Sequence, residues 1–197
     1  MTILIGLTGS IGMGKSTTAK LFAAEGCAVW DADAAVHRLY AAGGDAVAPV
    51  AALFPEAVIG GAVSREVLKQ IIDRDPQALK QIERIVHPLV AQDRARFIST
   101  STADIIVLDI PLLFENAGEA RVDATVCVSV DEATQKKRVM ERGTMTEAQF
   151  HDIHARQMPD AEKRALADYV VTTVTVEDAT AQVRSILAEL RERVSHA

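Results

Sequence analysis

TILIGLTGSIGMGKS, residues 2–16, is the stretch of sequence that decides the fold. Its first part, residues 2–8, is a short run of apolar and β-branched side chains that stops at a glycine, which is typical of a buried strand. Residues 15–26 follow with apolar side chains at helical spacing and end near Gly26. Residues 28–30 form a second short apolar run. Strand, glycine loop, helix and strand in this order predict a βαβ unit, and therefore a parallel sheet with a right-handed crossover.

The rest of the chain extends this sheet and interrupts it once. Residues 34–99 show only helical spacing, broken by glycines and prolines, so we expect a helical insertion in which Pro88 begins a new helix. Apolar runs return at residues 105–110, 125–130 and 169–172, which predicts three more strands buried on both faces. Polar residues 131–164 and amphipathic residues 178–194 predict further helices. The expected fold is α/β in three layers, with a five-stranded parallel sheet flanked by helices.

The glycine loop carries a phosphate-binding pattern. Residues 9–16 fit G-x-x-x-x-G-K-[ST], the Walker A motif or P-loop, and they lie between the predicted strand and the predicted helix. Glycines let successive backbone N–H groups turn toward phosphate oxygens, and the helix adds its own N-terminal donors. We expect a P-loop NTPase-type fold that binds a nucleoside triphosphate with Mg²⁺. The candidate nucleotide contacts, which become ATP contacts if the resemblance described below holds, are Gly9, Ile11, Gly12, Met13, Gly14, Lys15, Ser16 and Thr17.

Acidic residues follow two of the predicted strands. Asp109 ends its strand at the position of a Walker B acid, and with Ser16 it is a candidate Mg²⁺ ligand, although a turn before Pro111 would also explain it. Asp31 and Asp33 end the second strand, at the sheet edge where ligands of open α/β sheets bind. We interpret Asp31 as a structural cap. Asp33 is a candidate proton acceptor.

Arginines gather in the helical stretch after the fourth strand. Arg138 and Arg142 lie one turn apart, and Arg156 follows further along. Planar guanidinium groups bind phosphates well, so all three are candidate phosphate contacts, with a solvated charged face as the alternative. We expect Lys136, Lys137, Lys163 and Arg164 to be ordinary solvated side chains.

Two histidines are candidates for a role at the site. His37 lies one helical turn after Asp33 and is placed to orient Asp33 or to touch a substrate. His87 precedes Pro88, where a helix boundary alone would explain the pair.

Composition excludes several other classes of protein. The 197 residues carry 21 Lys+Arg and 27 Asp+Glu, a net charge of −6, which argues against general nucleic-acid binding. No apolar run approaches the length of a membrane helix, and the N-terminal residues do not read as a signal peptide, so we expect a cytoplasmic protein. The two cysteines, Cys27 and Cys127, both lie in apolar stretches, which indicates buried free thiols.

Taken together, these motifs and their separations resemble the dephospho-CoA kinase family. The resemblance covers nearly the whole chain in order and includes His37, Gln135, Arg138 and Arg142. The stretches that carry it are GLTG at 6–9, the P-loop, DAD at 31–33, HPLV at 87–90, DIPLLFE at 109–115, ARQM at 155–158 and ADYVV at 167–171. The chain departs from the family pattern at Ser10, at Met13 and at residues 172–174.

The resemblance implies ATP-dependent phosphorylation of the ribose 3′-hydroxyl of dephospho-CoA, which gives coenzyme A and ADP in the last step of coenzyme A biosynthesis. It implies a nucleotide-binding core at residues 1–33, 100–140 and 159–197, a CoA-binding helical domain at 34–99 and a lid at 141–158. Asp33 would be the catalytic base, with Lys15 and Arg138 as further catalytic residues, and Arg142 would bind ATP. The implied acceptor contacts are Thr8, Asp33, His37, His87, Leu112, Leu113, Phe114, Glu115 and Arg156.

The expected partner is this small-molecule substrate, with no nucleic acid and no membrane, in a monomer or weak homo-oligomer. Three other functions were weighed. A kinase for a nucleoside monophosphate or a sugar acid would share the loop and the lid but would not need the PLLFE turn or the long helical block. A GTP-binding switch would need an N-K-x-D motif, which does not follow the strand that ends near Val130. A protein with a dead site would not need Lys15, Ser16 and both candidate acids.

Overall fold

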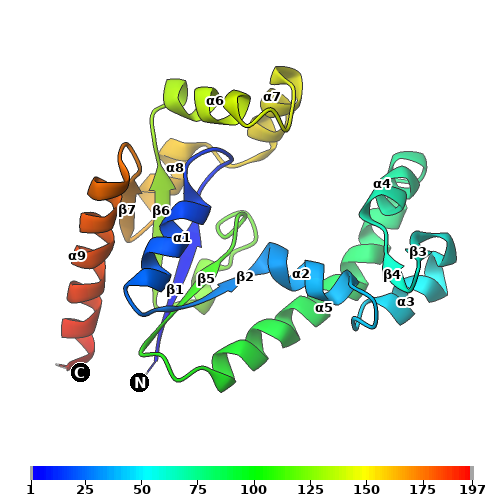
Figure 1. Cartoon of the computed structure of the whole chain (residues 1–197), viewed down its shortest axis with the longest axis horizontal. Helices are drawn as coiled ribbons and strands as arrows, with labels where there is room; N and C mark the ends of the chain where they lie inside the picture. Colours follow the sequence, from blue (N-terminus) through cyan, green and yellow to red (C-terminus); the bar gives the residue numbers. More distant parts are fainter. Residues whose placement is uncertain (1, 196–197) are drawn as a thin grey trace. The chain divides into compact units, whose positions relative to one another are not determined.

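The computed structural model describes residues 2–195, with the side chains of the last two left aside. Its main sheet has five strands in the order β2-β5-β1-β6-β7 (Figure 1). Strand β1 pairs in parallel with β5 and β6, and β6 pairs in parallel with β7. The bounds are β1 Ile3–Thr8, β2 Ala28–Asp31, β5 Ile105–Asp109, β6 Ala124–Ser129 and β7 Tyr169–Thr172. The predicted parallel α/β sheet is therefore confirmed.

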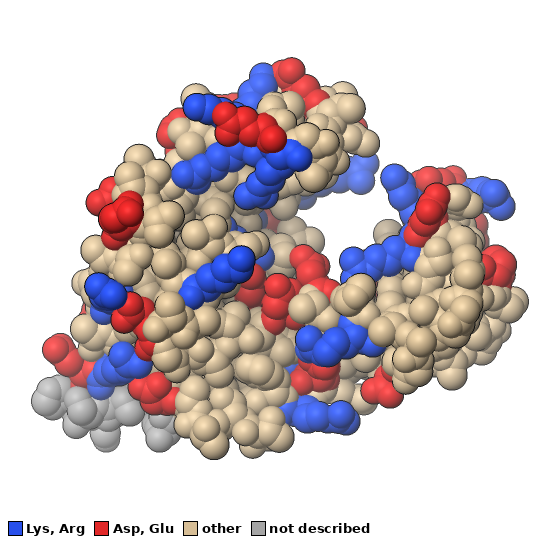
Figure 2. All heavy atoms as spheres, in the orientation of Figure 1, with Lys and Arg blue, Asp and Glu red and all other residues tan. Residues whose placement is uncertain are grey.

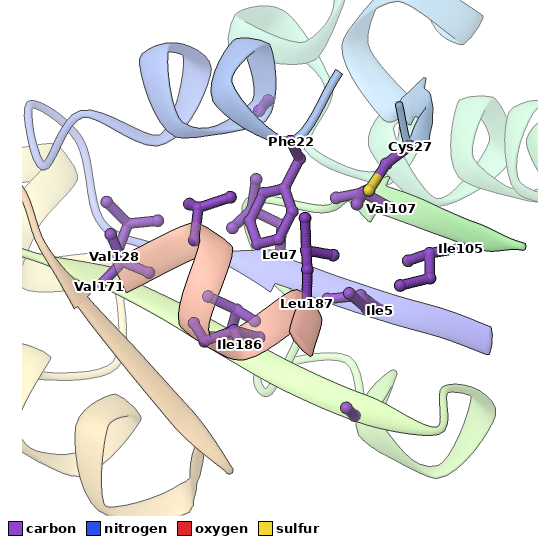
Figure 3. Close-up of a cluster of buried hydrophobic side chains, with 14 of the residues drawn as sticks. Ile5, Leu7, Phe22, Cys27, Ile105, Val107, Val128, Val171, Ile186 and Leu187 are labelled. Carbon is purple, nitrogen blue, oxygen red and sulfur yellow. The ribbon is translucent and has the colours of Figure 1, made fainter. Parts of the chain in front are cut away.

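Two helices from opposite ends of the chain cover one face of this sheet. They are α1, Lys15–Ala24, and α9, Val176–Ser195, and they pack against each other. Figure 3 shows Phe22 of α1 and Leu187 of α9 turned toward Leu7 of β1 in the centre of this core. Apolar side chains alternate along β6, with Val126 and Val128 on this side. Burial of this apolar surface is the main force that stabilises the sheet unit.

The opposite face of the sheet carries the shorter helices of the second half of the chain. Ser129 of β6 donates a hydrogen bond of 2.7 Å to Asp160 of α8, which places α8 on that face. The expected helical stretch at 131–164 is divided into three helices. They are α6 Glu132–Glu141, α7 Glu147–Arg156 and α8 Asp160–Leu166, and a one-turn helix, η2 Glu119–Arg121, precedes β6.

The chain divides into two compact units. One joins the residues up to Trp30 with those from Thr102 onward and contains the sheet; the other is Asp31–Ser101. The second unit has its own core, in which α2 packs against α5. Its elements are α2 Ala32–Tyr40, α3 Val47–Leu53, η1 Pro55–Ala57, β3 Val58–Ile59, β4 Ala62–Val63, α4 Arg65–Arg74 and α5 Gln77–Thr100.

Two details of this second unit differ from the sequence-based expectation. The expectation of helices alone was wrong, because β3 and β4 form an antiparallel hairpin. Gly60 and Gly61 both have positive φ, 59° and 80°, so they make a tight hairpin turn and not a simple helix break. The expectation that Pro88 begins a new helix was also wrong, since α5 continues through it. An interior proline costs about 3 kcal/mol, which the buried Ala78, Ile82 and Val86 of this helix offset by packing.

Both cysteines are buried and free, as their apolar surroundings indicated. Burial raises the pKa of the Cys27 thiol to about 11 and that of the Cys127 thiol to about 12. Neither thiol is therefore ionised at neutral pH. Both behave as small apolar core residues.

The core predicts a large effect for one substitution. Leu187→Ala removes a side chain that is 2% exposed, and the cavity should lower the free energy of unfolding by about 2 to 5 kcal/mol. Urea unfolding followed by fluorescence of Trp30, the only tryptophan, measures it in the sheet unit. Leu166→Ala, at a side chain that is 58% exposed, is the matched control and should change stability by less than about 0.5 kcal/mol. Equal effects of the two variants would contradict the described core.

Candidate nucleotide-binding site

The loop between β1 and α1 depends on two glycines. Gly12 and Gly14 have φ values of 77° and 95°, in the left-handed region that L side chains rarely adopt. A Cβ atom on Gly12 would lie 2.5 Å from Val139 Cγ2, and one on Gly14 would lie 2.9 Å from Thr173 Oγ1. Both the conformation and the close approach of neighbours therefore require glycine. Gly14 is also the residue that precedes the first turn of α1.

Lysine and aspartate of the two motifs meet beside this loop. The Lys15 ammonium donates to Asp109 Oδ1, and the Asp109 side chain is buried. The contact follows from the topology, because β1 and β5 are parallel neighbours and Leu7 is paired with Asp109. Ser16 and Thr17 are exposed at the start of α1. A cation, hydroxyl groups and N-terminal amides of a helix thus lie together, which is the chemistry that binds polyphosphate.

Side chains from later in the chain hold the loop from outside. The Ile11 carbonyl accepts a hydrogen bond of 2.7 Å from Nε2 of Gln135 in α6. The Ile11 N–H donates a hydrogen bond of 3.2 Å to Oε1 of Gln157, which lies just after α7. Met13 is buried, and its sulfur accepts from the Val130 N–H at 3.2 Å. The P-loop is therefore fixed by contacts with α6, with the end of α7 and with the end of β6.

Arg138 of α6 is tied to the turn after β7. Its guanidinium donates to Thr173 Oγ1 at 2.9 Å and to the Thr173 carbonyl at 2.5 Å, and Thr173 Oγ1 in turn donates to the Met13 carbonyl at 2.6 Å. A pocket of about 210 Å³ lies here, lined by Gly14, Thr17, Arg138, Arg142 and residues 173–176 among others. Thr173 links the arginine to the loop. Sequence analysis named residues 172–174 only as a departure from the family pattern, since nothing in the local pattern marks a buried hydroxyl.

A larger cavity of about 470 Å³ lies against the other side of the loop residue Met13. Its lining includes Gln135, Asp131, Asp160 and Arg164. Lys15, Ser16 and Asp109 do not belong to that lining, whereas the smaller pocket contains Gly14 and Thr17. The smaller pocket is therefore the better candidate for a nucleotide bound at the P-loop.

The PLLFE turn follows β5 and packs against the end of β1. Thr8 is buried and donates a hydrogen bond of 3.1 Å to the Pro111 carbonyl. Leu113 and Phe114 are buried, and Leu112 is 39% exposed. The turn thus presents Leu112 to solvent and uses its next two residues for packing.

Glu115, the last residue of this turn, forms a buried ion pair. Its Oε1 lies 2.9 Å from Lys163 Nζ and accepts from the Met158 N–H at 3.0 Å. Burial raises the pKa of Glu115, but Lys163 and the neighbouring amides outweigh it and hold the pKa below its usual value. The expectation that Lys163 is an ordinary solvated lysine was wrong, because its side chain is completely buried. Only the fold brings these residues together, so their sequence separation carried no signal.

The remaining candidate residues lie at the surface. In the helical unit, the Asp31 side chain accepts from the Ala34 N–H at 2.9 Å, which confirms it as the cap of α2. Asp33, in the first turn of α2 and not in the strand, is exposed with His37 one turn later, and His87 is exposed on α5. In the sheet unit, Arg142 and Arg156 are exposed. Figure 2 shows Lys and Arg side chains gathered over α6 and α7 at the top of the view, interspersed with acidic ones.

The sheet order, the loop and the Lys15–Asp109 pair define a P-loop kinase fold. A family model described as dephospho-CoA kinase matches residues 3–178. A dephospho-CoA kinase of Ruegeria pomeroyi is 64% identical over 197 residues, all of both chains. The chain belongs to the dephospho-CoA kinase family.

Solved structures share this fold. The crystal structure of TT1252 from Thermus thermophilus has a TM-score of 0.85 and 36% identity, over 96% of this chain and 98% of that one. A dephospho-CoA kinase from Campylobacter jejuni has the same fold, with a TM-score of 0.69 and 20% identity over 96% and 98% of the two chains. No helix among residues 2–195 is long and apolar enough to cross a membrane.

The loop geometry predicts a specific loss on substitution of Gly14. Gly14→Ala adds strain at positive φ and a contact with Thr173, each worth about 1 to 3 kcal/mol, so the Kd for ATP should rise at least about tenfold. Isothermal titration calorimetry measures it. Gly26→Ala is the matched control, since Gly26 has φ 91° but open space around its Cβ position. It should cost about 1 kcal/mol of stability and leave the Kd unchanged; a weakened Kd in both variants would contradict this reading.

Proposed function

We propose that this protein transfers the γ-phosphoryl group of ATP to the ribose 3′-hydroxyl of dephospho-CoA and releases coenzyme A and ADP. The observation that carries the proposal is the Lys15–Asp109 pair beside the P-loop, in a chain that belongs to the dephospho-CoA kinase family along most of its length. Relatives named dephospho-CoA kinase match it from end to end. The reaction would be the last step of coenzyme A biosynthesis, in the cytoplasm, by a monomer or weak homo-oligomer.

ATP binds along the P-loop in this proposal. Backbone amides of residues 9–17 hold the phosphate groups, and Lys15 leaves Asp109 to contact the β- and γ-phosphates. The base enters the pocket of about 210 Å³ beside Gly14. Arg138 forms a fixed wall there because Thr173 holds its guanidinium, while Arg142, which is exposed, closes over the nucleotide. Arg138 thus acts on the bound nucleotide from a preorganised position.

The residues present fit a magnesium ion. Ser16 and Asp109 offer a hydroxyl and a carboxylate, the oxygen ligands that Mg²⁺ prefers, and the Lys15 contact places the carboxylate next to the start of α1. When bound with ATP, the ion supplies neutralisation of phosphate charge. Asp109, once released by Lys15, would be available to hold the ion.

The acceptor binds through the helical unit and the PLLFE turn. Asp33, His37 and His87 offer exposed polar side chains, Leu112 offers an exposed apolar one, and Arg156 offers a cation for an acceptor phosphate. Thr8, Leu113 and Phe114 shape the turn from below. We assign residues 34–99 to acceptor binding and residues 141–158 to a lid, which must exclude water because an open site would hydrolyse ATP.

The transfer itself needs one proton acceptor. Asp33 takes the proton of the ribose 3′-hydroxyl as its oxygen forms a bond to the γ-phosphorus. The bond from that phosphorus to the β,γ-bridging oxygen breaks, and ADP leaves with the electron pair. Lys15 stabilises the charge that develops on the transferred group.

A panel of acceptors tests the function. Release of ADP, measured in a coupled assay with purified protein, should require dephospho-CoA and should be absent with AMP, adenosine or gluconate. Lys15→Ala should abolish turnover because the phosphate charge loses its only loop cation. Turnover with gluconate or AMP and none with dephospho-CoA would assign the protein to another class of P-loop kinase.

Asp33 gives a second test. Asp33→Asn keeps the size of the side chain but removes the proton acceptor, so kcat should fall by about 100-fold to 10,000-fold while the Kd for ATP stays unchanged. Steady-state kinetics and calorimetry measure the two quantities. Asp73→Asn, the same change at an exposed position of α4, is the control and should leave kcat unchanged. Near-normal turnover of Asp33→Asn would show that another group accepts the proton.

A further inference from the structure

A completely buried lysine in a nucleotide-binding protein requires an explanation. Lys163 lies on α8, and its ammonium has its charge partner, Glu115, at 2.9 Å at the end of the PLLFE turn. The Lys163 side chain is fully buried, and that of Glu115 is 18% exposed. Removing a charge from water is costly, and buried ion pairs are best attested where they fix how parts of a protein are positioned. The pair therefore has a use other than simple stabilisation.

Oε1 of Glu115 has a second partner besides Lys163, and this partner indicates what the ion pair does. Glu115 Oε1 accepts a hydrogen bond from the backbone N–H of Met158, at the end of the segment 141–158. Gln157, which precedes Met158, accepts a hydrogen bond of 3.2 Å at its Oε1 from the N–H of Ile11 in the P-loop. Lys163 thus orients Glu115, Glu115 holds the backbone at Met158, and that backbone places Gln157 on the loop.

The environment of Glu115 favours the ionised carboxylate, which is the form that this arrangement needs. Burial alone would favour the neutral acid, but the Lys163 contact and the amides hold its pKa below the usual value. An ionised carboxylate accepts hydrogen bonds from the Met158 N–H more strongly than a neutral one. Among the described residues, the second oxygen, Oε2, is buried without a hydrogen-bond partner. Although the side chain is 18% exposed, one carboxylate oxygen is buried and the other is already occupied by Lys163 and Met158, which leaves little of the group for an acceptor molecule.

We propose that Glu115 is a positioning residue, which together with Lys163 anchors the C-terminal end of segment 141–158 and so sets Gln157 against Ile11 of the P-loop. Its role is exerted through Met158 and Gln157 and not by contact with the acceptor. The proposal rests on the proposed function only for its kinetic effect. The anchor itself is a property of the protein without substrate.

Two double variants test it without leaving a charge buried. Glu115→Gln with Lys163→Met keeps a carbonyl oxygen for the Met158 N–H, whereas Glu115→Ala with Lys163→Met removes it. Both lack the ion pair, so both should fold, and thermal unfolding checks this. In hydrogen–deuterium exchange without substrate, the first variant should match the wild type over residues 144–158, and the second should exchange faster there but not in β1 or β5.

Kinetics with ATP and dephospho-CoA provide the second readout. The first variant should keep kcat within about threefold of the wild type, and the second should lose about 10-fold to 100-fold, because a small displacement of a site-forming segment costs that much. The KM for dephospho-CoA should change by less than about twofold in both. A KM for dephospho-CoA raised equally in the two variants would overturn the proposal and make Glu115 an acceptor contact.

Equal exchange over residues 144–158 in the two variants would also overturn it, since Met158 would then not depend on residue 115. A clear difference in exchange with no turnover of dephospho-CoA in the wild type would leave the anchor established and the proposed function wrong. The single variant Lys163→Met adds a check on the pair, because an unpaired buried carboxylate should lower the unfolding temperature more than either double variant does.

Discussion

The contact between Lys15 and Asp109 is the interaction on which the site depends. It joins the first residue of α1 to the last residue of β5, and it exists only because β1 and β5 are parallel neighbours in register. A lysine on a flexible stem would otherwise sample many directions. Asp109 holds the Lys15 ammonium beside the P-loop. In the proposed function, a phosphate group that replaces the carboxylate meets a lysine that is already oriented, so binding loses little further side-chain entropy.

The conformation of the P-loop is unfavourable by itself and is stabilised by hydrogen bonds from neighbouring elements. The loop has three glycines with positive φ, which lose much backbone freedom on folding. Gln135, Thr173 and Gln157 each offset part of that loss with a hydrogen bond to Ile11 or Met13. These three side chains come from residues far along the chain. A loop proposed to bind phosphate with its backbone amides thus depends on side chains that carry no charge.

Much of this arrangement could be predicted from sequence, and the exceptions have physical causes. Short apolar runs predicted all five strands of the main sheet, because a strand buried on both faces has few other patterns available. The P-loop pattern and the acid at the end of β5 singled out Lys15 and Asp109, but their direct contact was not predicted. Pro88 was wrongly expected to begin a helix, because packing along α5 outweighs the local cost of a proline. Gly60 and Gly61 were wrongly interpreted as a break between helices, because a pair of glycines suits a hairpin turn as well as a helix end. Lys163 was missed for a different reason: its partner is 48 residues away, and no local pattern encodes such a pair. His37 lies one helical turn after Asp33 as expected, but Asp33 was expected at the end of a strand and lies in the first turn of α2. The chemistry of both residues stays a proposal.

The two separate hydrophobic cores have a thermodynamic consequence. Leu187 belongs to one core and Val86 to the other, so heat or denaturant acts on two cooperative bodies that share a chain. A nucleotide held by the P-loop lowers the free energy of the body that contains it and gives the other no direct benefit. Unfolding of the two cores is therefore best followed with a separate probe in each. If the helical core loses its order first, acceptor binding in the proposed function is lost while the P-loop stays folded.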